Sequence, residues 1–166
     1  MRHKLIALAT KLRLPFSAGT IAGLVATIPM TFFMLLLQHV LPHQQRYALP
    51  PERITNEIAE RVGVKEHLDK RQRSGAALVS HFGYGASMGA LYTLFARRIP
   101  LPSLIKGAVF GLVVWIGSYL GLLPALRLSQ SAPREPSERN LMMIAAHLIW
   151  GAVTGVVAES LMRLEV

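Results

Sequence analysis

Two histidines of this chain begin copies of one local pattern: histidine, two residues, an aromatic residue, Gly-Ala, two residues and glycine. His81 begins the copy at residues 81–89, and His147 begins the copy at residues 147–155. An imidazole can titrate near neutral pH, and it also ligates metals and haem iron. The pair is therefore a candidate for proton transfer, for cofactor binding or for hydrogen bonding between helices.

Each of these roles requires different neighbours. Bis-histidine haem b would need both imidazoles at one depth, with Gly85 and Gly151 leaving room for the flat macrocycle. A metal site would take His39 as a third ligand. A structural pair would hydrogen-bond across helices for about 1 kcal/mol, and this is the role that we favour. A proton or small-solute path would run along the polar interior residues Thr27, Thr31, Ser80 and Thr154.

No motif in the chain indicates an enzyme. The absence of Cys excludes disulfides and thiolate chemistry. The sequence also contains no G-x-S-x-G, no Walker motif, no H-E-x-x-H and no paired carboxylates. We therefore expect a protein that is not an enzyme and that carries no resident cofactor, with haem b as the alternative.

Composition indicates a membrane protein. Hydrophobic residues make up 52% of the chain and charged residues only 16%, against about 25% charged in soluble domains. The net charge is +9, but the basic residues flank apolar runs, which suits anionic lipid headgroups better than nucleic acid. We predict a single all-α membrane domain over residues 1–166. Its four spans are predicted at about residues 17–41, 74–95, 104–126 and 140–162.

The first long loop contains a further helical pattern. Pro50 suits the first turn of a helix, Ile54 and Ile58 recur at i and i+4, and Gly63 is placed to end it. These signals predict a short amphipathic helix at about 51–62. We expect it to lie on the bilayer surface or to cap the helix bundle.

Glycine spacing predicts how the spans pack. Lipid gives helices no hydrophobic reason to associate, so small residues that allow close approach have to bring them together. Ten of the 13 glycines form G-x-x-x-G pairs. The pairs are Gly19/Gly23, Gly85/Gly89, Gly107/Gly111, Gly117/Gly121 and Gly151/Gly155.

The patterns also predict an internal repeat. The second and fourth spans share the histidine pattern, and the first and third share G-x-x-x-G-Leu-Val from Gly19 and from Gly107. Two helical hairpins would then be related by a pseudo-two-fold axis along the membrane normal. Both histidines should point into the bundle at one depth. Glu159 lies too far from His147 to share its site, and we expect it to pair with Arg163 at i+4.

Part of this pattern resembles a known family. The shared residues are His81…Tyr84-Gly85…Gly89…Tyr92, Pro100…Gly107…Gly111, Gly121-Leu-Leu-Pro124 and His147-Leu-Ile-Trp150. Over about residues 78–155 the chain is similar to the uncharacterised bacterial inner-membrane family of YagU. The resemblance implies a bacterial plasma-membrane location and a four-helix fold, and it brings no established catalytic residues.

Orientation and assembly follow from charge and glycine content. Basic residues precede the first span, so we expect both termini on the cytoplasmic side. The glycine pairs exceed what one small bundle needs, which predicts a homo-oligomer or other membrane-protein partners in addition to the lipid bilayer.

Overall fold

The computed structural model describes residues 2–96 and 99–164, with side chains from residue 16 onward. Every regular element in these residues is helical, which confirms the all-helical prediction. The longer helices are α1 (Arg2–Gln38), α2 (Pro50–Arg61), α3 (Lys70–Ala96), α4 (Ser103–Ile116) and α6 (Ser137–Leu164). The shorter ones are η1 (His43–Gln45), η2 (Lys65–His67), the π-helical segment η3 (Gly117–Leu122), α5 (Leu123–Ala125) and η4 (Ala132–Arg134).

Three segments of the described chain are long and apolar enough to cross a membrane. They are Phe16–Gln38, Ser103–Ala125 and Ser137–Leu164, which supports the prediction of a membrane protein. Helix α3 covers the predicted span at 74–95 but is not among these three. Its histidine, tyrosine, serine and glycine residues make it less apolar than the others.

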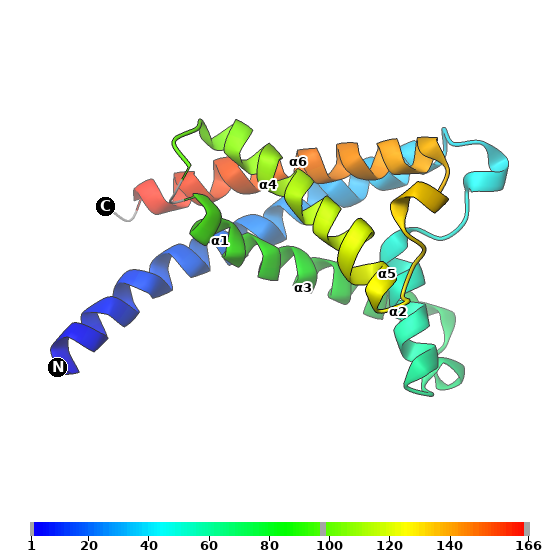
Figure 1. Ribbon diagram of the computed structural model, residues 1–166. Coiled ribbons are helices and arrows are strands. Elements are labelled where there is room, and N and C mark those ends of the chain that lie inside the picture. The colour runs from blue at the N-terminus through cyan, green and yellow to red at the C-terminus, as the bar shows by residue number, and fades with distance from the viewer. Residues whose placement is uncertain (1, 97–98, 165–166) are drawn as a thin grey trace.

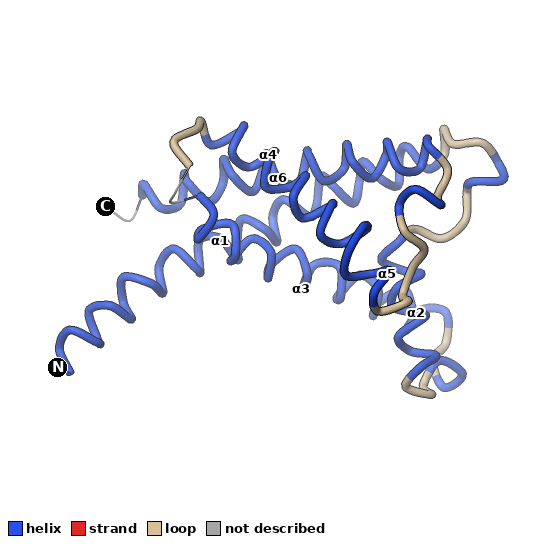
Figure 2. The backbone as a smooth tube through the Cα atoms, viewed as in Figure 1, coloured by secondary structure: helices blue, strands red, loops and turns tan. Residues whose placement is uncertain are grey.

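The long helices pack in the spatial order α3, α1, α6, α4. Helix α1 packs on both α3 and α6, and α6 packs on α4, whereas α3 and α4 make little contact with each other. Figure 1 shows α1 and α4 running away from the end that holds both chain termini, and α3 and α6 returning to it. The tube in Figure 2 shows α2 at the opposite end, with the loops on either side of it and the loop that precedes α6. We call this opposite end the loop side.

Local signals fix the ends of α2 and α3. Gly63, with φ of +73°, follows α2, and the amide of Val64 donates to the carbonyl of Ala59 at 3.0 Å. This is the Schellman arrangement, which glycine favours because it accepts positive φ without strain. Asp69 and Gln72 exchange side-chain hydrogen bonds with each other's amides at 2.8 Å, which forms a capping box at the start of α3.

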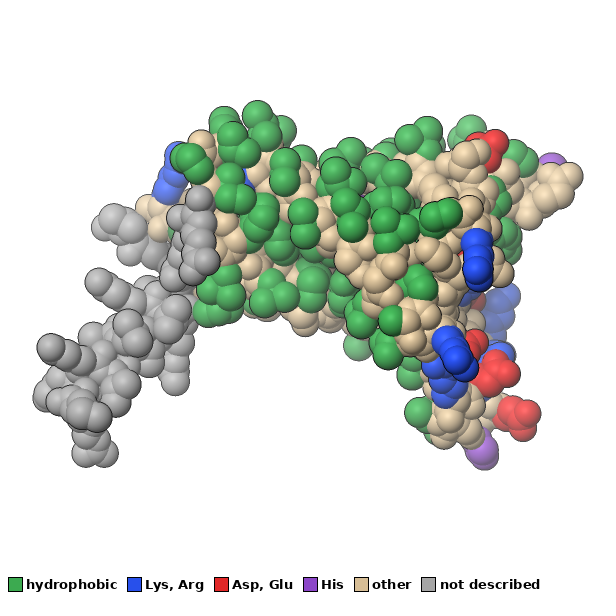
Figure 3. Space-filling view, viewed as in Figure 1, with side chains coloured by type: hydrophobic (Ala, Val, Ile, Leu, Met, Phe, Trp, Pro, Cys, Tyr) green, Lys and Arg blue, Asp and Glu red, His purple; other side chains and the backbone are tan. Residues whose placement is uncertain are grey.

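Apolar side chains cover the outside of the long helices. Phe32, Ile28 and Leu141 are among the exposed ones, and Figure 3 shows hydrophobic side chains along the helical body with the charged ones gathered around α2. A soluble protein would leave so much apolar surface uncovered only at an interface. The distribution suits contact with lipid along the body and with water or headgroups at the loop side.

Candidate functional site

Glycines bring α1 and α3 into backbone contact. A Cβ atom placed on Gly89 would overlap the carbonyl oxygen of Gly19 and would lie 2.7 Å from the Cα of Gly23. A Cβ on Gly23 would overlap the carbonyl oxygen of Gly85. All four glycines of these two G-x-x-x-G pairs therefore lie in one packed interface.

The same kind of interface joins α4 and α6. A Cβ on Gly151 would overlap the carbonyl oxygen of Gly107 and would lie 2.8 Å from the Cα of Gly111. A Cβ on Gly155 would overlap the carbonyl oxygen of Ser103. These contacts hold α4 and α6 as a second close pair, beside the pair that α1 forms with α3.

The remaining glycine pair does not pack helices within the chain. A Cβ on Gly117 or Gly121 would meet no heavy atom within 4 Å among the described residues, so the packing role predicted for them has no partner helix there. Both lie in the π-helical segment η3. The G-x-x-x-G spacing places both glycines on one face of a helix. It does not show whether another helix packs against that face. Segments of π-helix are frequent at functional sites, and η3 lines the cavity described next.

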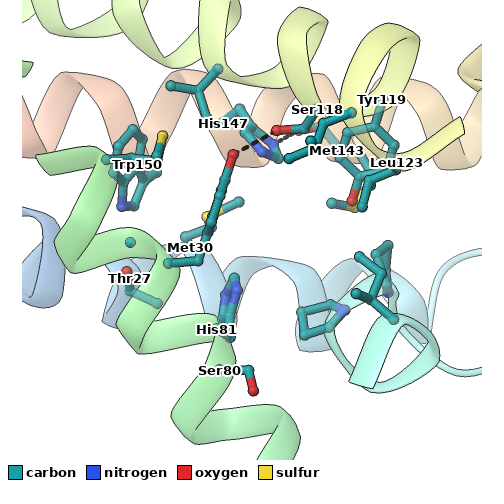
Figure 4. Close-up of a pocket in the computed structure, with 18 of the residues that line it drawn as sticks. Thr27, Met30, Ser80, His81, Ser118, Tyr119, Leu123, Met143, His147 and Trp150 are labelled. Atoms are coloured by element: carbon teal, nitrogen blue, oxygen red, sulfur yellow. Dashed lines mark hydrogen bonds between the residues drawn. The ribbon is translucent and has the colours of Figure 1, made fainter. Parts of the chain in front are cut away.

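A cavity of about 280 Å³ lies between α1, α2, α3, α6 and η3. Most of its wall is apolar, and the polar groups include His81 and His147. Figure 4 shows these two side chains on opposite walls, His81 from α3 and His147 from α6. The structure thus places both predicted histidines at one cavity and adds Ser118 and Tyr119, which the sequence patterns did not indicate.

His147 is buried, and its tautomer is set by its own helix. The Nδ1 atom lies 2.7 Å from the carbonyl oxygen of Met143. A carbonyl oxygen can only accept, so Nδ1 carries the hydrogen and Nε2 is left as an acceptor. The edge of the imidazole meets the ring of Tyr119 at 5.9 Å between centroids, which holds the ring in place.

His81 differs from His147 in its hydrogen bonding. Its side chain is half-buried, and its Nε2 atom is buried with no hydrogen-bond partner among the described residues. A buried polar atom without a partner costs stability, so in native structures such an atom requires an explanation. A bound molecule that hydrogen-bonds to Nε2 would supply one.

The cavity gathers part of the predicted polar interior, since Thr27 and Ser80 line it with the two histidines and Thr31 and Thr154 do not. Thr27 and Thr154 are fully buried, but each hydroxyl donates to a carbonyl one turn back in its own helix, at 2.7 and 2.8 Å. Half-buried Thr31 donates to the carbonyl of Thr27 in the same way. Ser80 is exposed and lines the cavity from α3. The three threonine hydroxyls are therefore hydrogen-bonded within their own helices.

One hydrogen bond joins α3 to η3 beside the cavity. The hydroxyls of Tyr84 and Ser118 lie 2.8 Å apart. Ser118 is buried and Tyr84 is 39% exposed, so the bond lies where the cavity approaches the protein surface. No sequence pattern indicated this contact, because a serine in an apolar span more often bonds to its own helix.

A polar cluster on the loop side ties α2 to the start of α6. The Arg53 guanidinium forms an ion pair with Glu135 at 2.8 Å, and the Tyr47 hydroxyl donates to the same carboxylate. Arg139 is buried, stacks over the ring of Tyr47 at 3.7 Å and donates to the carbonyl of Gln45 at 2.6 Å. Cation–π contact and charge-assisted hydrogen bonds together fix the loop that carries α2 over the cavity.

The charge state of Glu135 makes this attachment sensitive to acid. Burial raises the pKa of the carboxyl, but the hydrogen bonds from Tyr47 and Arg53 outweigh it, so the pKa lies below its usual value of 4.5. A lowered pKa in the folded state adds stability above the unfolded value, and this stability is lost as the pH falls. The carboxylate is therefore a stabilising group at neutral pH.

We expect the midpoint of thermal unfolding to fall as the pH is lowered below about 4.5, the usual value for Glu135. In Glu135→Gln this acid-dependent part should be absent, and stability at neutral pH should be lower by about 1–3 kcal/mol. Circular dichroism of the purified protein in detergent measures both the acid dependence of the unfolding midpoint and the stability at neutral pH. The matched control is Glu57→Gln, since the Glu57–Arg61 pair is exposed and should contribute little. An unchanged acid dependence in Glu135→Gln would show that another group is responsible.

At the opposite end, a second polar cluster joins three long helices. The Lys106 ammonium of α4 lies 2.7 Å from the carboxylate of Glu159 on α6, and Tyr92 of α3 donates to that carboxylate at 3.1 Å. The predicted pairing of Glu159 with Arg163 is therefore wrong. The i+4 rule considers only one helix, whereas the cation that reaches Glu159 comes from a neighbouring helix.

A comparison with protein families identifies the chain only at the family level. The family model of proteins of unknown function named DUF1440 matches residues 40–156, which is more than half of the chain. The chain belongs to the DUF1440 family. The match includes both histidine patterns and the whole of α2. No curated protein and no solved structure matches this chain.

In this DUF1440 protein an aromatic layer separates the cavity from the Lys106–Glu159 pair. Phe110 contacts Tyr92, Phe95 and Trp150, at 5.2 to 6.1 Å between ring centroids. The indole of Trp150 also donates to the carbonyl of Gly23 at 3.2 Å. Trp150 lines the cavity and Tyr92 hydrogen-bonds to Glu159, so these rings lie between the two sites.

The metal site proposed from the sequence does not form in the described part of the chain. No three His, Asp or Glu side chains there are close enough to hold an ion. His39 is exposed near the end of α1, and it is not among the residues that line the cavity with His81 and His147.

Proposed function

We propose that this DUF1440 protein is a non-enzymatic, multi-span membrane component that binds a membrane-dissolved molecule between His81 and His147. The observation that carries the proposal is the buried, unpartnered Nε2 of His81 beside an otherwise apolar cavity. A molecule with an apolar body and one polar group would satisfy that atom and fill the cavity. Ligand sites commonly combine an apolar wall with a few such polar groups.

The proposal includes α3 as a fourth membrane span. Residues 74–96 contain no Asp, Glu, Lys or Arg. At 1.5 Å per residue they extend about 34 Å, which is enough for a hydrocarbon core of about 30 Å. Gly85 and Gly89, two of the glycines that lower the hydropathy of α3, face α1, so these two do not have to face lipid.

The proposal also includes two hairpin repeats. In the first, α1 and α3 pair through Gly19, Gly23, Gly85 and Gly89. In the second, α4 and α6 pair through the corresponding residues Gly107, Gly111, Gly151 and Gly155. Helices α1 and α6 then join the two hairpins, as expected of a parallel repeat in a membrane protein.

The exposed residues around the cavity support a source in the membrane. Ile58 of α2 is 45% exposed and Leu122 of η3 is 50% exposed, and both line the cavity. Tyr84 of α3 completes this edge. The edge is made largely of apolar side chains, and α3 and α4 have little contact there. We call it the lateral mouth, and a molecule dissolved in lipid would enter through it.

The resemblance to the YagU family supports a bacterial inner-membrane location, and the basic residues before the first span support cytoplasmic termini. We also propose self-association. Gly117 and Gly121 are exposed and have no partner helix within the described chain, so a second copy could approach closely at η3.

Two other functions use the same cavity. A proton or small-solute path is favoured by the facing histidines, but it would require the aromatic layer around Phe110 to open. Haem b would need an Nε2 atom from each histidine, and His147 keeps this atom free while its Nδ1 is engaged. A Soret band in the purified protein that disappears in His81→Ala would establish haem in place of the proposed ligand.

Tryptophan fluorescence tests whether the cavity binds apolar molecules. The chain has two tryptophans, and Trp150 lines the cavity whereas Trp115 does not. We expect 1-bromododecane to quench Trp150 in the Trp115→Phe variant more strongly than it quenches Trp115 in the Trp150→Phe variant. Val114 lines the cavity, so the larger side chain of Val114→Phe should fill part of it. Adding this substitution should remove the difference in quenching between the two tryptophans. Equal quenching of both tryptophans, unaffected by Val114→Phe, would contradict the proposal.

A further inference from the structure

Building on the proposed function, we infer that the polar group of the ligand is a hydroxyl held between the imidazoles of His81 and His147. The ligand class is then a neutral long-chain alcohol or another lipid with a free hydroxyl group. The inference depends on which hydrogen bonds the two rings can still make.

The His147 ring requires a donor. Its Nδ1 hydrogen is used by the carbonyl oxygen of Met143, so Nε2 on the far side of the ring can only accept. His147 lines the cavity, and none of the described residues donates a hydrogen bond to its Nε2. A ligand with an O–H group would satisfy His147.

The His81 ring supplies the matching donor. No hydrogen bond from the described residues reaches its buried Nε2, so no protein group fixes its tautomer. The tautomer with hydrogen on Nε2 can donate to a ligand oxygen. His81 and His147 face the cavity from opposite walls (Figure 4). A ligand hydroxyl within reach of both rings would accept from His81 and donate to His147.

Other polar groups fit this pair less well. A ketone or ether oxygen can only accept, and it would leave Nε2 of His147 without a donor. A carboxylate or ammonium group would bring a charge into a mostly apolar wall with no counter-ion lining the cavity, which is costly. A hydroxyl is neutral and both donates and accepts.

The cavity size and the lateral mouth determine the rest of the ligand. About 280 Å³ holds the hydroxyl end and part of a chain, but not a complete long-chain lipid. The remaining chain would pass the apolar edge formed by Ile58 and Leu122 and extend into the bilayer. Ligand and membrane would therefore share one continuous apolar path.

Competition between matched lipids tests the inference. A long-chain alcohol carrying a diazirine is photo-cross-linked to the full-length protein in nanodiscs, and the labelled peptide is mapped by mass spectrometry. Unlabelled hexadecanol and hexadecyl methyl ether then compete for the site. We expect hexadecanol to compete about tenfold better, because the ether cannot donate to His147. The ratio should approach one in His81→Phe and in His147→Phe, and it should persist in Ser87→Ala, because Ser87 of α3 does not line the cavity and bonds to its own helix.

The outcomes separate this inference from the proposed function. Equal competition by alcohol and ether would overturn hydroxyl recognition while leaving an apolar binding cavity. Failure of both to compete would overturn both proposals. If a histidine variant does not fold, the wild-type protein still decides the question. A cross-link beside His81 or His147 that prefers hexadecanol supports the inference, and a cross-link elsewhere contradicts it.

Discussion

Replacing Glu159 by glutamine should lower the free energy of unfolding by about 3 kcal/mol. The substitution leaves the Lys106 ammonium without its carboxylate, in a site where the side chain of Lys106 is 10% exposed. Removing one partner of a buried ion pair typically costs about 3–5 kcal/mol, because the remaining charge stays desolvated. We expect a cost near the lower end of this range, because Lys106 lies in the first turns of α4. Its long side chain can therefore carry the ammonium toward water at the helix end.

The matched control removes both charges. In the double variant Lys106→Met/Glu159→Gln no buried charge is unpaired, so most of the lost stability should return. Titration with a denaturing detergent, followed by circular dichroism, measures all three proteins. Tyr92→Phe should have a smaller effect, because it removes one hydrogen bond and leaves the ion pair in place. A Glu159→Gln protein as stable as the wild type would show that the pair does not hold α4 to α6.

The helices were largely predictable because their signals are local. Pro50 and Gly63 bound α2 within one residue of the predicted 51–62, since first-turn proline and terminal glycine act on the backbone next to them. The span at 74–95 lies within α3 for a similar reason, because charged residues flank an uncharged run. Helix α1 extends to Arg2, but its apolar span begins at Phe16, close to the predicted start of the span at 17.

The candidate site was only partly predictable, because it depends on contacts between helices. One pattern placed His81 and His147 in equivalent positions, yet only His147 bonds to its own helix through Nδ1, and only His81 has a buried nitrogen without a partner. The difference comes from their surroundings, which the pattern does not contain. No local pattern of residues marks the π-helical turn that brings Ser118 and Tyr119 to the cavity, and its glycines resemble a packing motif.

Substitution of Gly89 by alanine should destabilise the protein by about 1–3 kcal/mol, the usual cost of overpacking a close contact. A Cβ at this position would overlap the carbonyl oxygen of Gly19 and would lie 2.8 Å from the backbone nitrogen of Gly23. The obstacles are backbone atoms, so a side-chain rotation cannot relieve them, and α1 and α3 would have to move apart. That movement would also weaken the neighbouring contact between Gly23 and Gly85.

The same helix supplies the control for this prediction. Gly83 also lies in α3, but a Cβ there would meet nothing within 4 Å. Alanine is the better helix former, so Gly83→Ala should stabilise α3 by about 0.5–1 kcal/mol. The two substitutions are chemically identical and lie six residues apart in α3, so opposite signs in detergent unfolding would isolate the effect of helix contact. If both variants gained stability, the close approach of α1 and α3 at Gly89 would be wrong, and the proposed hairpin would lose its principal support.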